Sequence, residues 1–344
     1  MLQAVMTAPG HIEYKDVPKP QLRPDQVLIR IQSIGVCGSD IHVYHGKHPY
    51  TPFPVVQGHE VSGDVVAVGE NVTDIAVNDA VTVIPQVVCG ECHPCRHGNY
   101  HICENLKVMG FQTTGMASEL FAVDRDKVFK LPPGISFDLG AMVEPLAVAV
   151  HAYTRTDDVK GKKVLVLGAG PIGILVAQAG KALGAEAVMI TDLSDYRLDI
   201  ARQCGVDYTV NVGEVDLEQE ITDRFGPDRA DLIMECVGVN ATINDAIENA
   251  RKGTDIVIVG VFGDKPTADL GLVQDRELRL IGTLMYKNED YDRTIAMIAE
   301  DQVNLQPMIT HHYPFSQYLD AYKYIDAHRD ETVKVIISVQ DTGG

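Results

Sequence analysis

Four of the seven cysteines of the chain lie within the segment CGECHPCRHGNYHIC at 89–103. They are spaced C-x2-C-x2-C-x7-C and are Cys89, Cys92, Cys95 and Cys103. Four thiolates can surround one Zn²⁺ tetrahedrally at about 2.3 Å, and the two-residue spacings let one loop supply three of them. A bacterial ferredoxin cluster would need its next cysteine after three residues and before a proline, so zinc fits better than iron and sulfur. Because four sulfur ligands leave no open coordination position, we expect a structural zinc site.

Three histidines, His93, His97 and His101, lie in the same segment. With four sulfur atoms available, we expect these histidines to stay outside the metal shell. The alternatives to a metal site are four unrelated buried cysteines or a redox disulfide pair. In a reducing compartment, clustered cysteines are interpreted as metal ligands before disulfides.

A second metal-type pattern is dispersed along the chain. It consists of Cys37 in GVCGSDIH, His59 and Glu60 in QGHEVSG, and Glu144 in MVEPLAVAVHA. A cysteine, a histidine and carboxylates from different elements would give three protein ligands with one position left for water or substrate. That arrangement is typical of a catalytic zinc. Spacing alone does not decide the matter, because isolated residues of these types are common.

The segment VLGAGPIG follows the apolar run of a buried strand and leads into a helical pattern. Its G-x-G-x-x-G spacing, in a strand–turn–helix context, indicates a dinucleotide-binding turn whose helix N-terminus attracts the pyrophosphate. The candidate coenzyme contacts in this turn are Gly168, Gly170, Pro171, Ile172 and Gly173.

Asp192 ends the next predicted strand, nineteen residues after Gly173. A carboxylate at this position would accept a hydrogen bond from the ribose 2′-hydroxyl of NAD and repel the 2′-phosphate of NADP. Arg197 lies nearby and could instead accommodate a phosphate. We expect NAD to be the coenzyme.

These groups fall on two kinds of local pattern. From 26 to 85, short β-branched runs separated by Gly, Pro, Asn and Asp predict an antiparallel, turn-rich β domain. From about 151, six apolar runs alternate with helical segments at 194–204, 214–225 and 240–250. This alternation predicts an α/β fold with a doubly wound parallel sheet. The expected domains are 1–150 together with 288–344, and 151–287.

The charge of the chain limits its partners. A formal net charge of −19 and a pI near 4.9 would repel phosphate backbones and anionic lipid surfaces, so we expect neither nucleic acid nor membrane as a partner. The opening residues MLQAVMTAPGHIEYKD lack the pattern of a secretory signal, and no later run approaches the roughly 18 apolar residues of a membrane span. We expect a cytoplasmic protein.

Six motifs, in order, resemble the zinc-containing medium-chain dehydrogenase/reductase family, within it the sorbitol (polyol) and threonine dehydrogenase branch. They are GVCGSDIH, GHEVSGDVVAVG, the 89–103 segment, MVEPLAVAVHA, VLGAGPIG and ITDLSDYRLDIA. The resemblance implies a GroES-like β-rich catalytic domain joined to a Rossmann coenzyme domain, with structural zinc in the cysteine lobe. It also implies a homodimer or homotetramer.

The same resemblance assigns roles to individual residues. Cys37, His59 and Glu60 would bind the catalytic zinc, with Glu144 bound directly or through water. Ser39 is similar to the family's proton-accepting hydroxyl, and His42 to the relay to solvent. Arg197 would lie against the adenosine half of NAD, and Val259, Gly260 and Val261 along the nicotinamide half.

We therefore expect a zinc- and NAD-dependent dehydrogenase that converts a secondary alcohol of a polyol to a ketone. Sorbitol dehydrogenases carry a substrate-contacting arginine before the tyrosine of GTLMYKN, where this chain has Met285. Without that fixed charge, sugar-acid 5-dehydrogenase (L-gulonate or L-galactonate type), 2,3-butanediol dehydrogenase and L-threonine 3-dehydrogenase activities stay open. A catalytically inactive NAD-binding protein is the distant alternative.

Overall fold

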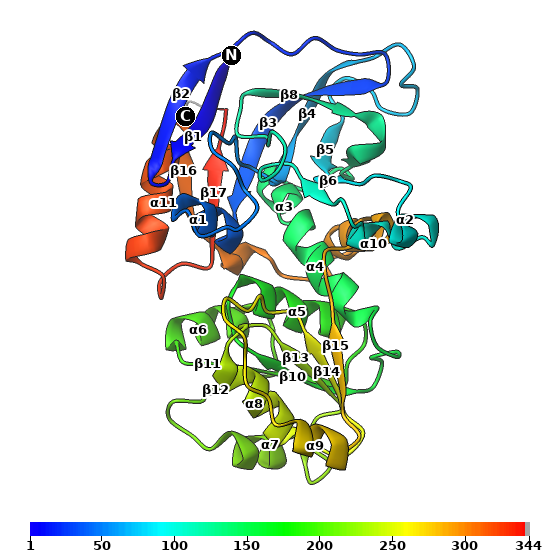
Figure 1. Ribbon diagram of the computed structural model, residues 1–344, viewed down its shortest axis with the longest axis vertical. Coiled ribbons are helices and arrows are strands. Elements are labelled where there is room, and N and C mark those ends of the chain that lie inside the picture. Colours follow the sequence, from blue (N-terminus) through cyan, green and yellow to red (C-terminus); the bar gives the residue numbers. More distant parts are fainter. Residues whose placement is uncertain (341–344) are drawn as a thin grey trace. The chain divides into compact units, whose positions relative to one another are not determined.

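The computed structural model describes residues 1–340 and forms two compact units (Figure 1). The first unit comprises Met1–Glu144, Lys287–Ala299 and the residues from Ile309 onward. The second unit comprises Pro145–Tyr286 and Glu300–Met308. The first boundary differs from the expected 150–151, because helix α4 (Val143–Tyr153) precedes the first apolar strand and most of it already belongs to the second unit.

The first unit is built around a seven-stranded sheet in the order β16-β17-β3-β4-β5-β9, with β8 also pairing with β3. Two short two-stranded sheets, β1-β2 and β6-β7, complete it. Its strands are β1 (Leu2–Ala8), β2 (His11–Asp16), β3 (Gln26–Val36), β4 (Glu60–Val68), β5 (Ala80–Val83), β6 (Gln86–Val87), β7 (Lys107–Val108), β8 (Leu120–Asp124), β9 (Val128–Lys130), β16 (Ile309–Pro314) and β17 (Lys334–Ser338). Its helices are α1 (Gly38–Tyr44), α2 (His93–Arg96), α3 (Phe137–Ala141), α10 (Asn288–Ala299) and α11 (Tyr318–Ala327).

The C-terminal segment completes the sheet of the first unit. Strand β17 pairs antiparallel with β3, which places the last strand of the chain beside one of the first. The polar segment HHYP, which has no strand pattern in the sequence, forms part of the edge strand β16 and pairs parallel with β17. An edge strand is only half covered, so it tolerates polar side chains that a central strand would exclude.

The second unit confirms the predicted doubly wound α/β fold. Its six strands all pair in parallel, in the order β12-β11-β10-β13-β14-β15. They are β10 (Lys163–Leu167), β11 (Ala187–Asp192), β12 (Tyr208–Asn211), β13 (Leu232–Glu235), β14 (Asp255–Ile258) and β15 (Arg279–Gly282). The connecting helices are α5 (Pro171–Ala182), α6 (Asp195–Gln203), α7 (Leu217–Phe225), α8 (Asn240–Asn249) and α9 (Leu270–Asp275), coloured green to orange in Figure 1. The strand order reverses between β10 and β13, the point at which such sheets bind nucleotides.

The two units have separate apolar cores. Strands β3, β4 and β5 supply much of the first core, and β10, β13 and the helices α7 and α8 supply much of the second. Within residues 1–340 no helix is long and apolar enough to cross a bilayer.

Candidate active site

Strand pairing in the first unit brings the dispersed metal-type residues together. Strands β3 and β4 are antiparallel neighbours, and Gly35 near the end of β3 pairs with Glu60 at the start of β4. Cys37 follows β3 directly and His59 precedes β4 directly, so both lie at the same end of this strand pair. Gly35 leaves room for the Glu60 carboxylate, because a Cβ atom at position 35 would collide with Oε2 of Glu60.

The side chains of Cys37, His59 and Glu60 form a group that could hold a metal ion. Their ligand atoms lie within 4.8 Å of one another, and His59 and Glu60 are buried. Thiolate, imidazole and carboxylate are the ligands that zinc takes in catalytic sites, so the donor set fits Zn²⁺. Glu144 is buried but is not a member of this group, although its charge acts on the neighbouring Lys334.

Asp40 contacts two of these three residues. It lies in the first turn of α1, is 1% exposed, and accepts a hydrogen bond from the Cys37 backbone N–H through Oδ2 at 2.9 Å. Its Oδ1 lies 3.4 Å from Nδ1 of His59, at ion-pair distance but without hydrogen-bond geometry. Burial lowers the pKa of His59, but Asp40 and Cys37 together outweigh it and hold that pKa well above the usual value. With Nδ1 turned to Asp40, Nε2 is the ring nitrogen left for a metal.

Glu60 is also held by a buried ion pair. The ammonium group of Lys334, at the start of β17, lies 2.8 Å from Oε1 and 2.6 Å from Oε2 of Glu60. The two side chains are 2% and 1% exposed. Burial lowers the pKa of Lys334, but the charges of Glu60, Cys37 and Glu144 raise it by more, so the net pKa is above the usual value. Any metal bound by Glu60 would therefore share this carboxylate with a cation.

Helix α1 carries the two residues expected to handle the proton. Cys37 is the N-cap residue, Ser39 lies in the first turn and is half-buried, and His42 lies in the last turn and is exposed. Residues three apart share one face of a helix, so the serine and histidine side chains lie on the same side of α1. This placement leads from the metal-type group toward solvent.

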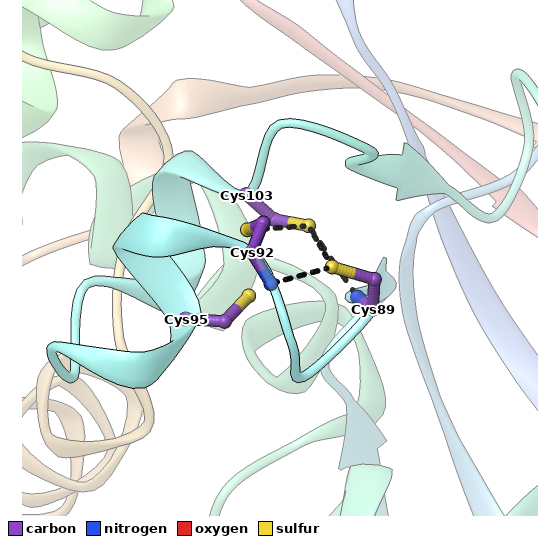
Figure 2. A group of neighbouring side chains, drawn as sticks. All are labelled: Cys89, Cys92, Cys95 and Cys103. Atoms are coloured by element: carbon purple, nitrogen blue, oxygen red, sulfur yellow. Dashed lines mark hydrogen bonds between the residues drawn. The ribbon is translucent and has the colours of Figure 1, made fainter.

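Figure 2 shows the other group that could hold a metal ion, the four cysteines of the 89–103 segment. Their sulfur atoms lie within 4.8 Å of one another, including Cys103 Sγ at 3.5 Å from Cys89 Sγ and 3.8 Å from Cys92 Sγ. Backbone N–H groups of Glu91 and Cys92 lower the pKa of Cys89 to about 6, whereas burial and neighbouring thiols raise that of Cys95 to about 12. A thiol cluster pointing inward to one centre fits a four-sulfur zinc site.

The cysteine lobe is anchored to the helix that returns the chain to the first unit. The Tyr100 hydroxyl accepts a hydrogen bond from the Asn288 backbone N–H at 2.8 Å, and Lys287 donates to Asn99 at 3.1 Å. These contacts tie the lobe to the start of α10.

In the second unit, the glycine-rich turn connects β10 to α5. Gly168 has a φ of +98°, and a Cβ at Gly173 would collide with the Gly168 carbonyl, so the chain itself requires both glycines. Gly170 is different, because a Cβ atom there would meet nothing within 4 Å. A glycine with open space above it fits the close approach of a pyrophosphate, and Pro171 opens α5 behind it, followed by Ile172.

Asp192 ends β11 and supports this turn. Its Oδ2 accepts a hydrogen bond from the Ala169 N–H at 2.7 Å, and its Oδ1 accepts one from the Ser194 N–H at 2.9 Å. Each carboxylate oxygen can accept a further bond, so contact with a ribose hydroxyl stays open. Arg197 is half-buried in the first turn of α6.

Val259, Gly260 and Val261 follow β14. The N–H groups of Val259 and Gly260 both donate to the Glu235 carbonyl, and Val261 is 84% exposed. A Cβ at Gly260 would collide with the Gly238 backbone, so this glycine is explained by packing within the protein. The exposed Val261 side chain is available to a coenzyme.

Two residues at the metal-type group were missed by sequence reasoning. Asp40 had a local signal, since it lies three residues after Cys37 and closes a capping box with it. Lys334 had a fainter one, a lysine within the apolar strand VKVIISV. Neither signal names a partner, which only strand pairing supplies.

The coenzyme turn at the switch point of a parallel sheet, together with a largely buried Cys–His–Glu group in a β-rich unit, defines a metal-dependent oxidoreductase of the alcohol dehydrogenase type. Comparison with known families agrees with this class. Residues 23–133 match the alcohol dehydrogenase GroES-like domain, and residues 171–300 match the zinc-binding dehydrogenases. The chain belongs to the zinc-binding, medium-chain dehydrogenase family, which confirms the predicted family, fold and enzyme class.

Named relatives match along most of the chain. The sorbitol dehydrogenase of Halalkalibacterium halodurans is 35% identical over 96% of this chain and 97% of its own length. The 2-dehydro-3-deoxy-L-galactonate 5-dehydrogenase of Pseudoalteromonas atlantica is 36% identical over 88% and 89%. A zinc-binding dehydrogenase from Sinorhizobium meliloti, solved with NADP, has a TM-score of 0.90 at 28% identity, covering 98% of this chain and 99% of that one.

Proposed function

We propose that the protein oxidises a secondary alcohol of a small polyhydroxylated substrate to a ketone, with Zn²⁺ and NAD. The observation that supports this most is the grouping of Cys37, His59 and Glu60 at the end of one strand pair, with Ser39 on the helix that Cys37 caps. A structural metal site would not need a hydroxyl beside its ligands. A catalytic site does need one, because the substrate proton must leave.

Each residue has a role in this proposal. Zn²⁺ held by Cys37, His59 and Glu60 would lower the pKa of the substrate hydroxyl, and NAD would accept the hydride from the carbon. Ser39 accepts the hydroxyl proton as it releases its own toward His42, and His42, exposed on the same face of α1, passes a proton to solvent. Glu144 is held near the group, either as a ligand or through water. The four-cysteine lobe holds a structural zinc and takes no part in the chemistry.

A polyol such as sorbitol is the leading substrate, because the chain is similar to a sorbitol dehydrogenase over nearly its whole length. A sugar acid is the alternative, since the chain is 36% identical to a sugar-acid 5-dehydrogenase over a shorter alignment, against 35% for the sorbitol dehydrogenase. Met285 bears on this choice. It holds a left-handed backbone conformation with φ of +52° and offers no charge. Diols and threonine complete the set of candidates.

NAD is the proposed coenzyme because of Asp192. A carboxylate at the end of β11 fits a ribose diol and opposes a 2′-phosphate. The Sinorhizobium meliloti relative was solved with NADP, and a calorimetric comparison of NAD and NADP binding to this chain tests the choice.

The test is a screen of NAD reduction across polyols, sugar acids, threonine and diols, followed by metal analysis. We expect ketone formation with one of these classes, two zinc ions per chain, and loss of turnover in Cys37→Ser with the four-cysteine zinc retained. Turnover that survives Cys37→Ser would contradict the assignment of the catalytic site. We further propose a cytoplasmic homodimer or homotetramer, to be checked by light scattering.

A further inference from the structure

A buried chain of polar side chains connects the C-terminal helix α11 to the metal-type group. The Tyr322 hydroxyl donates to Oε1 of Gln57 at 3.0 Å, and Nε2 of Gln57 donates to Oδ1 of Asp40 at 3.1 Å. Tyr322 and Gln57 are 0% and 2% exposed. Neither residue belongs to the metal-type group.

The order of these hydrogen bonds fixes the direction of the Gln57 amide. A hydroxyl donor at Oε1 leaves the NH₂ group of Gln57 to face Asp40, where a carboxylate needs a donor. If the amide turned over, its carbonyl oxygen would face the carboxylate and its NH₂ group would face the hydroxyl. The Asp40 carboxylate, which can only accept, therefore selects this amide orientation, and the Tyr322 hydroxyl stabilises it by donating to Oε1.

The ring of Tyr322 is held independently of its hydroxyl. It packs on Tyr44 of α1 at 5.6 Å between ring centroids and stacks on Tyr318 at 5.4 Å. A phenylalanine would keep these ring contacts and lose only the hydroxyl. Buried polar groups cost free energy unless they are hydrogen-bonded, so apolar residues at 57 and 322 would be sufficient for packing alone.

Asp40 connects this series of hydrogen bonds to the metal-type group. Its Oδ2 accepts the Cys37 N–H, and its Oδ1 lies between Gln57 and His59. A carboxylate that is fixed on one side by an amide cannot rotate freely away from the imidazole on the other. Groups that orient ligands in this way change metal affinity by roughly 10- to 100-fold when removed.

We propose that Gln57 and Tyr322 are positioning residues of the catalytic metal site, holding Asp40 so that it orients both His59 and the Cys37 backbone. This proposal rests on the proposed assignment of Cys37, His59 and Glu60 as metal ligands. Tyr322 acts through Gln57, and Gln57 acts through Asp40.

The experiment measures Co²⁺ and Zn²⁺ binding to the full-length protein by chelator competition, together with the Co²⁺ absorption spectrum. The variants are Tyr322→Phe, Gln57→Met and their double mutant, and the difference between the unmodified protein and Cys37→Ser isolates the catalytic site. Tyr153→Phe is the matched control, because the buried Tyr153 hydroxyl donates to the Val176 carbonyl at 2.9 Å in the second unit.

We expect Gln57→Met to weaken metal binding roughly tenfold or more, with an altered Co²⁺ spectrum, and Tyr322→Phe to weaken it less. The double mutant should bind no more weakly than Gln57→Met, since both changes break one chain of contacts. Tyr153→Phe should bind metal as the unmodified protein does. If Gln57→Met fails to fold, Tyr322→Phe alone still carries the comparison.

Three results would overturn the proposal or its premise. Unchanged affinity and spectrum in Tyr322→Phe and Gln57→Met would show that neither residue positions the site. Additive losses in the double mutant would show that Tyr322 does not act through Gln57. Equal metal binding by Cys37→Ser and the unmodified protein would instead remove the metal site itself, and with it the proposed function.

Discussion

Replacing Lys334 by methionine should leave Glu60 as an uncompensated buried charge in the metal-free protein. The ammonium lies within 2.8 Å of both carboxylate oxygens, and each side chain is at most 2% exposed. Removing one partner of a buried ion pair costs about 3–5 kcal/mol. A domain of about 150–250 residues loses roughly 2–4 °C of Tm per kcal/mol, so we expect a fall of roughly 6–20 °C.

The assay is thermal unfolding of chelator-treated protein, followed by circular dichroism. Lys323→Met is the matched control, because the Lys323–Asp320 pair is 3.8 Å long and its side chains are 58% and 62% exposed. Exposed pairs contribute about 0–1 kcal/mol, so this variant should unfold near the unmodified protein. The double variant Lys334→Met, Glu60→Gln should recover much of the loss, since it removes both charges.

The pH dependence of thermal unfolding provides a second test of this prediction. The pKa of Lys334 is raised by Glu60 against the opposing effect of burial, so its contribution is fully present below the unfolded value of about 10.4. It should be lost as the pH rises through the higher folded value, and Lys334→Met should lack this alkaline step. A Lys334→Met protein that unfolds within the range of the control at pH 7 would refute the reasoning.

Three further predictions concern the proton, the coenzyme and the metal. Ser39→Ala should lower kcat roughly 100-fold or more with zinc content unchanged, and His42→Ala about 10- to 100-fold with recovery at high pH; unmodified rates in both would mean that water carries the proton. The unmodified protein should bind NAD roughly 100- to 1,000-fold more tightly than NADP by calorimetry, and Asp192→Asn should narrow that gap, so equal binding before mutation would contradict the role of Asp192. Because the pKa of metal-free His59 is raised, protons should compete with Zn²⁺ already above pH 6.5, and the affinity for Zn²⁺ should rise with pH. Chelator competition between pH 6 and 9 would measure this dependence. A Zn²⁺ affinity that does not change with pH would count against His59 as a ligand.

The sequence predicted what depends on local pattern. Six apolar runs became the six parallel strands, because a strand buried on both faces is continuously apolar. The four-cysteine lobe was equally predictable from the sequence, since its candidate ligands come from one short segment. Strand β16 was missed because its residues are polar, and helix α9 because its six residues are too short for helical periodicity.

The surroundings of the candidate active site were harder to predict from the sequence, because their contacts join distant segments. Lys334 and Glu60 are 274 residues apart, and Tyr322 and Gln57 are 265 apart. No spacing rule connects such pairs. They meet because β17 pairs with β3, which pairs with β4, and because α11 lies in the core of the same unit.

The charges gathered around Cys37, His59 and Glu60 give a physical reason for a lysine beside the proposed metal ligands. The Cys37 thiolate and the Glu60 carboxylate together would balance the charge of Zn²⁺. With these two groups alone the site would be neutral and would stabilise a deprotonated hydroxyl only weakly. Lys334 adds a positive charge in contact with Glu60 and so limits the negative charge that Glu60 presents to the metal. A buried site with excess positive charge favours the deprotonated form of a hydroxyl held within it. In the proposed mechanism, the buried ion pair therefore connects the order of strands β17, β3 and β4 to the ease with which a substrate alcohol would lose its proton to Ser39.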